Sequence, residues 1–74
     1  MLTELEAAIL TEMYLPDEHT RKALLRYLRQ ADKANERQQS RWLAEYVQLV
    51  QKVRGRELPA VQADTLIRLV RALL

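Results

Sequence analysis

The sequence contains no cysteine and very little histidine, glycine or proline. Its 74 residues include one histidine, one glycine and two prolines. Without cysteine, the chain has no disulfide, thiolate zinc site or iron–sulfur cluster. One histidine rules out a multi-histidine metal site, and one glycine rules out a glycine-rich phosphate-binding loop. We therefore expect no metal, no cofactor and no small-molecule substrate, and we do not expect an enzyme.

A chain this short needs an additional source of stability. Small domains usually rely on a disulfide, a metal, oligomerisation or close helix packing. The sequence is 49% hydrophobic and has fourteen leucines, enough for the core of a single domain over 1–74. With no disulfide available, we expect tight helix packing and a homodimer.

No part of the sequence predicts a membrane segment or a secretion signal. No apolar run approaches the length of about 18 residues that a transmembrane helix requires. The first residues are acidic, whereas a signal peptide begins with basic residues and continues into an apolar stretch. We therefore expect a cytoplasmic protein.

The two ends of the chain are predicted to be helical. Apolar residues recur there every three or four positions, which is typical of an amphipathic helix. A first helix is expected over about 3–14, with Thr3 and Glu6 as a capping box. A last helix is expected over about 60–73, with Pro59 at or near its first position. No alternating strand pattern competes with these helices.

The segment 17–54 is predicted to be either one long helix or a helical hairpin. It contains no proline or glycine, and its two apolar stripes have the same helical phase, which favours one helix. A helix of that length is uncommon, which favours a break. Three polar residues in the middle are suitable N-caps for a second helix: Asp32, Asn35 and Ser40. Gly55 is predicted to end the segment as a C′ glycine.

The small net charge of +2 conceals an uneven distribution. Residues 1–20 have five acidic and no basic residues, a net charge of −5, whereas residues 21–56 have ten basic and three acidic residues, a net charge of +7. Six of the basic residues are spaced three or four apart: Lys22, Arg26, Arg29, Lys33, Arg37 and Arg41. Such a strip is either an ordinary solvated helix face or a binding surface for nucleic acid or an acidic protein.

Large apolar residues follow the basic strip at the spacing of a helix–helix seam. The seam residues are Trp42, Tyr46, Leu49 and Val53. Such a seam belongs either to the core of one chain or to an interface with a second copy or a partner. Aromatic residues are frequent anchors in binding interfaces.

Together these patterns predict an all-α domain of three or four helices, most simply a dimeric helical bundle. The layout is similar to small helical regulators of bacteria and phages and to secretion co-chaperones, but no motif identifies a family. We expect a small interaction protein (an adaptor, inhibitor or regulator) that docks a helix face on a protein partner as a homodimer. The alternative is a nucleic-acid-binding regulator that uses the basic strip, although no helix-turn-helix signature is present.

Overall fold

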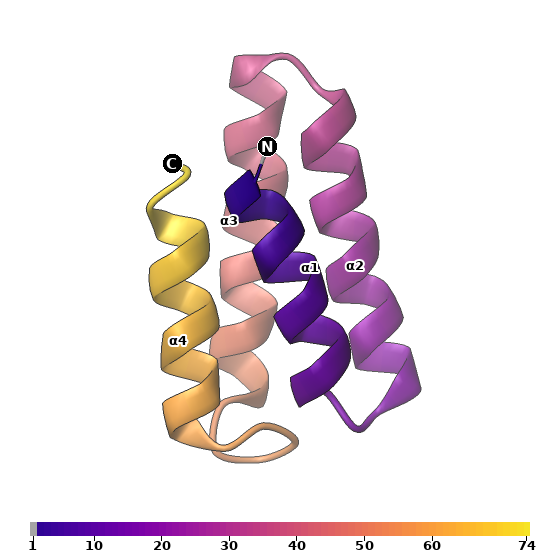
Figure 1. The fold of residues 1–74 in the computed structure, drawn as a ribbon, viewed down its shortest axis with the longest axis vertical. Helices are drawn as coiled ribbons and strands as arrows, with labels where there is room; N and C mark the ends of the chain where they lie inside the picture. Colours follow the sequence, from indigo (N-terminus) through magenta and orange to yellow (C-terminus); the bar gives the residue numbers. More distant parts are fainter. Residues whose placement is uncertain (1) are drawn as a thin grey trace.

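A computed structural model describes residues 2–74 of the chain, with side chains from Glu4 onwards. Over these residues it contains four α-helices and no strand, which confirms the all-α prediction. The helices are α1 (Leu2–Tyr14), α2 (Glu18–Lys33), α3 (Glu36–Val53) and α4 (Ala60–Arg71). They run alternately down and up in a four-helix bundle (Figure 1). In the described part of the chain, no helix is both long enough and apolar enough to cross a membrane.

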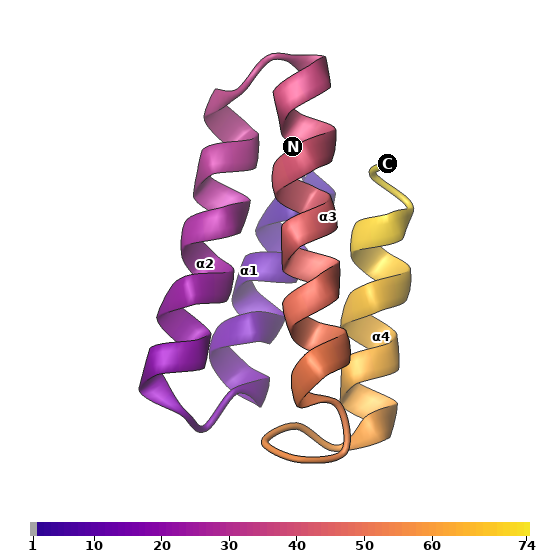
Figure 2. The ribbon, with the colours of Figure 1, turned by 180° about the vertical axis from the view of Figure 1, so that it is seen from behind.

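The central segment is a helical hairpin, not one long helix. Of the three candidate caps, Asn35 is the one used: its side chain accepts a hydrogen bond of 3.0 Å from the backbone N–H of Gln38. The hairpin places α2 and α3 side by side (Figures 1 and 2). Leu28 of α2 and Leu43 of α3 are consequently buried in one core. A single straight helix would have held the two apolar stripes apart.

The four helices form a ring in which each helix packs closely along two neighbours. The packed pairs are α1 with α2, α2 with α3, α3 with α4, and α4 with α1. Helices α1 and α3 therefore lie on a diagonal (Figure 2). The largest fully buried side chains are Tyr46, Leu15, Leu24, Leu43, Leu58 and Leu66. Close packing of these side chains is one source of stability for a chain without disulfides.

Two helix ends differ slightly from the prediction. Helix α1 begins at Leu2, so Thr3 lies within its first turn and not before it. The side-chain bonds of the predicted capping box lie outside the described residues. Helix α4 ends at Arg71, two residues early. There the backbone tightens into a turn in which the N–H of Leu73 donates to the carbonyl of Val70.

Gly55 occupies the predicted position after α3, and its conformation requires glycine. Its φ angle is +77°, in the left-handed region. Its N–H donates to the carbonyl of Leu58 at 2.7 Å and closes the loop to α4. We expect Gly55→Ala to lower the free energy of unfolding by about 1 kcal/mol, because a Cβ atom strains this backbone conformation. Urea titration measures this loss, with Gln51→Ala on the exposed side of α3 as a control. Equal stability of the two variants would contradict the left-handed conformation of Gly55.

Candidate functional site: the groove between α1 and α2

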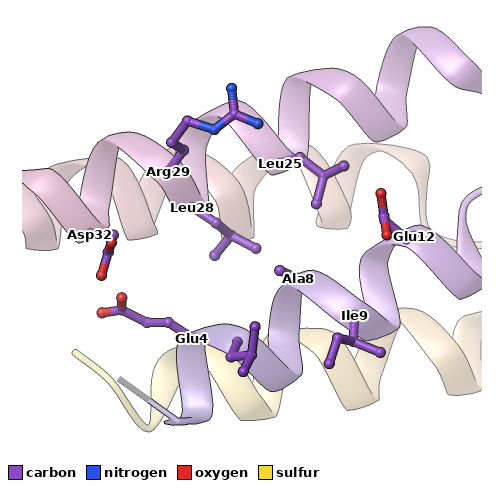
Figure 3. Close-up of a pocket in the computed structure, with 9 residues that line it drawn as sticks. Glu4, Ala8, Ile9, Glu12, Leu25, Leu28, Arg29 and Asp32 are labelled. Carbon is purple, nitrogen blue, oxygen red and sulfur yellow. The ribbon is translucent and has the colours of Figure 1, made fainter.

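A groove of about 770 Å³ runs between α1 and α2 (Figure 3). This volume falls within the range of ordinary ligand pockets, about 300–1,000 Å³. Helix α1 lines one side and α2 the other. The lining residues are Glu4, Leu5, Ala8, Ile9, Glu12, Leu25, Leu28, Arg29 and Asp32. We call this feature the α1–α2 groove.

One border of the groove is an exposed apolar stripe on α1. Leu5, Ile9 and Met13 follow one another at intervals of four residues and are 56%, 49% and 71% exposed. The opposite face of α1 is already in the core, through residues such as Ala7. Helix α1 therefore has apolar residues on two faces, and the bundle covers only one of them. Apolar residues gathered on a surface are typical of interaction sites.

The groove has an apolar centre and acidic ends. Ala8 and Leu28 lie between the two helices (Figure 3). At one end, the carboxyl groups of Glu4 and Asp32 point toward one another, and Glu12 lies at the other end (Figure 3). Arg29 is the one cationic residue in the lining. The lining therefore combines apolar contact surface with three carboxyl groups and one guanidinium group.

Glu4 is held in place by a contact with α3. Its side chain is only 7% exposed, and its Oε1 accepts a hydrogen bond of 3.0 Å from Nε2 of Gln39. Burial, followed by the neighbouring Asp32 carboxyl group, raises the pKa of Glu4 above its ordinary value. The ionised form of Glu4 is therefore disfavoured in the folded chain.

We expect Glu4→Gln to stabilise the protein at pH 7. When the pKa of a glutamate is higher in the folded chain than in the unfolded chain, its contribution to stability is fully present below the unfolded pKa. This contribution is lost as the pH rises through the folded pKa. A glutamine keeps the acceptor for Gln39 without the charge. The expected gain at pH 7 is about 0.5 kcal/mol, and it disappears below the ordinary pKa of 4.5.

Urea titrations at neutral and acidic pH measure this effect. Glu12→Gln is the matched control, because it makes the same charge change at an exposed position. An equal gain in both variants, or a gain that persists at acidic pH, would argue against a perturbed Glu4.

The hairpin divides the predicted basic strip between two antiparallel helices. All six residues are exposed. Lys22, Arg26, Arg29 and Lys33 belong to α2, and Arg37 and Arg41 belong to α3. Lys22 pairs with Glu18 at 3.0 Å, and Arg29 lines the α1–α2 groove. A single strip along one continuous helix, as the spacing suggested, is therefore not present.

A second surface feature joins α2 and α3. The rings of Tyr27 and Trp42 stack with their centroids 6.0 Å apart and their planes 28° apart. The guanidinium of Arg26 lies 5.8 Å from the centroid of the Tyr27 ring. Arg41 lines a depression beside both rings, together with Gln38 and Glu45. We call Tyr27, Trp42, Arg26 and Arg41 the aromatic patch.

The structure divides the predicted seam residues between the interior and the surface. Tyr46 and Val53 are buried in the core of the single chain. Trp42 and Leu49 are half-buried and pack against that core. Tyr46 and Val53 are therefore inaccessible to a second chain in this fold, and Trp42 is the seam residue that belongs to a surface feature.

The sequence patterns did not single out the α1–α2 groove. Its signal was present in α1, where apolar residues occupy more than one face and acidic residues accompany them. No sequence pattern indicated that α2 lines the same groove, because Leu25 and Asp32 are distant in sequence from α1. Only the packing of the two helices makes one groove from these residues. Comparisons of the chain with models of protein families, with curated proteins and with solved structures found no significant match.

Proposed function

We propose that this protein is a small non-enzymatic interaction protein, an adaptor, inhibitor or regulator, that docks on a protein partner through the α1–α2 groove. The observation that carries the proposal is the exposed stripe of Leu5, Ile9 and Met13 beside this groove. A groove between two helices accepts the apolar face of a third helix, which is a recurring mode of peptide recognition. Covering the stripe would remove its apolar surface from water, at a gain of about 25 cal/mol per Å².

Site-specific crosslinking tests this proposal. A photo-reactive amino acid replaces Ile9 beside the groove, and in the control it replaces Val61, which is 79% exposed on α4 outside the groove. Irradiation in cells of the source organism is expected to give a discrete adduct with another protein from position 9 and not from position 61. The same products from both positions, or none from position 9, would contradict the proposal.

Homodimerisation remains a prediction of the sequence. It rests on the small size of the chain and on the absence of cysteine, which leaves oligomerisation as one way to gain stability. A dimer would have to use surfaces other than Tyr46 and Val53, which the chain itself buries. Light scattering at micromolar concentration measures the mass directly. We expect twice the chain mass of 8.7 kDa, and a monomer would contradict the prediction.

Nucleic-acid binding is the second candidate function, and the aromatic patch supports it. Stacked rings beside arginines are the elements that hold single-stranded nucleic acid, since bases stack on the rings and the arginines contact phosphates. Tyr27 and Trp42 supply the rings, and Arg26 and Arg41 supply the charges. For this candidate function, the aromatic patch replaces the whole basic strip as the proposed binding surface for nucleic acid.

A salt titration distinguishes this second candidate. Binding of single-stranded and duplex DNA and RNA is measured at about 50 mM and about 200 mM salt, where phosphate contacts weaken steeply. The double variant Arg26→Gln/Arg41→Gln is expected to lose binding. The control Arg68→Gln/Arg71→Gln removes the same charge from α4 and is expected to keep it. No binding at low salt excludes this function.

A further inference from the structure

The carboxylates at the ends of the α1–α2 groove form no ion pair within the described residues. The two ion pairs of the described chain involve Glu18 and Asp64, neither of which lines the groove. At one end, Glu4 and Asp32 face each other (Figure 3), which is unfavourable when both are ionised. The three carboxylates against the single Arg29 leave the lining with a charge of −2 when all are ionised. A ligand with positive charge at both ends would relieve the repulsion between Glu4 and Asp32 and would pair with Glu12 at the other end.

The geometry points to a basic amphipathic helix of a partner protein as the occupant of this groove. The inference rests on the proposed function and adds the chemistry of the partner. The apolar face of the helix would lie over Ala8 and Leu28, and its lysines or arginines would reach Glu12 at one end and the pair of Glu4 and Asp32 at the other.

The length of α1 between the acidic residues sets the spacing of the partner's charges. Glu12 lies eight positions after Glu4, which is about 12 Å along the helix at 1.5 Å per residue. Positions i and i+7 of a partner helix are about the same distance apart and lie on one face. We therefore expect basic residues at i and i+7 with apolar residues at i+3 and i+4 between them.

Charge favours such a partner over a second copy of this chain. In a two-fold dimer through the groove, the same surface faces itself. Three carboxyl groups and one arginine would then meet an identical set, so that two acidic surfaces would be brought together. A basic helix reverses this sign, because its cations approach the carboxylates while its apolar residues cover the α1 stripe.

Three synthetic helical peptides test the inference. All have leucines at i+3 and i+4 on an alanine- and glutamine-based helix, and they differ only at i and i+7, with lysine, glutamine or glutamate. Fluorescence anisotropy measures affinity, and amide chemical shifts of the labelled protein locate the binding site. We expect the lysine peptide to bind in the α1–α2 groove about fivefold more tightly than the glutamine peptide, and the glutamate peptide to bind most weakly.

Two double variants identify the carboxylates responsible. Glu12→Gln/Asp32→Asn is expected to remove the preference for lysine and to leave binding of the glutamine peptide unchanged. Glu36→Gln/Glu45→Gln, which makes the same charge change at exposed positions of α3, is expected to keep the preference.

The outcomes separate the partner's chemistry from the proposed function. Equal binding of the lysine and glutamine peptides in the groove would overturn the inference, while supporting a docking groove. Tighter binding of the glutamate peptide, or no groove shifts with any of the three peptides, would also overturn it. Crosslinking from position 9 still decides the proposed function in every case.

Discussion

Tyr46→Ala is expected to lower the free energy of unfolding by about 3–5 kcal/mol, the range for truncation of a large buried aromatic side chain. Tyr46 is the largest fully buried side chain of the described structure, with 0% exposure. A domain of 74 residues has a total stability of about 4–11 kcal/mol. The substitution therefore removes a large part of the stability. Urea unfolding followed by the fluorescence of Trp42, the single tryptophan, measures it.

The control for Tyr46→Ala is Leu49→Ala, another seam residue on the same helix. Leu49 is only half-buried, so its truncation removes fewer core contacts and costs less. A loss with Tyr46→Ala no larger than with Leu49→Ala would contradict the placement of Tyr46 in the core. Repeating the titration at several protein concentrations also tests the seam, because an interface between chains makes stability depend on concentration.

Thr11→Val is expected to lower the free energy of unfolding by about 2 kcal/mol, because it leaves a buried hydroxyl without a partner. Oγ1 of Thr11 donates to the carbonyl of Ala7 at 2.6 Å and lies 2.7 Å from the hydroxyl of Tyr46. Since Thr11 has one hydroxyl proton, the Tyr46 hydroxyl donates in the second bond. Burial raises the pKa of Tyr46 to about 12, so this donor keeps its proton at neutral pH.

Substitution of Tyr46, the other partner in this bond, is expected to cost less. Tyr46→Phe removes the hydroxyl but leaves Thr11 bonded to the carbonyl of Ala7, so no buried donor loses its partner, and the expected loss is about 1 kcal/mol. The loss measured for the double variant should be smaller than the sum of the losses of the two single variants, because both substitutions remove the same bond. Urea titration of the three variants gives the coupling energy. Strict additivity would contradict a direct bond between these side chains.

The bond between Thr11 and Tyr46 connects two helices that lie on a diagonal of the bundle. Helices α1 and α3 are not neighbours in the ring, yet Thr11 and Tyr46 join them through the core. The side chain of Tyr46 is long enough to reach from α3 to α1. In the core, Thr11 accepts the hydrogen bond from the Tyr46 hydroxyl. The seam spacing placed Tyr46 on an apolar face but not its partner, because residues 35 positions apart in the chain leave no pattern in the local sequence.

The sequence by itself determined the two terminal helices and the outer limits of the helical segment between them, but it left open whether that segment is one helix or two. Apolar spacing predicted helices near both termini, Gly55 was predicted as a helix end, and Asn35 was one of three candidate N-caps, because these roles depend on neighbouring backbone groups. The sequence also showed the separation of charge between residues 1–20 and 21–56. These features are local, so they depend on short-range sterics and hydrogen bonding that a sequence pattern records.

Tertiary structure decided which apolar faces are buried and which remain exposed. The hairpin at Asn35 placed the two predicted apolar stripes on two antiparallel helices and divided the basic strip between them. Packing placed Tyr46 in the core while leaving Ile9 at the surface, although both are apolar residues at helical spacing. A helix with two apolar faces can bury either one, and the choice follows from the volume that its neighbours leave to fill. The α1–α2 groove is the result of that choice.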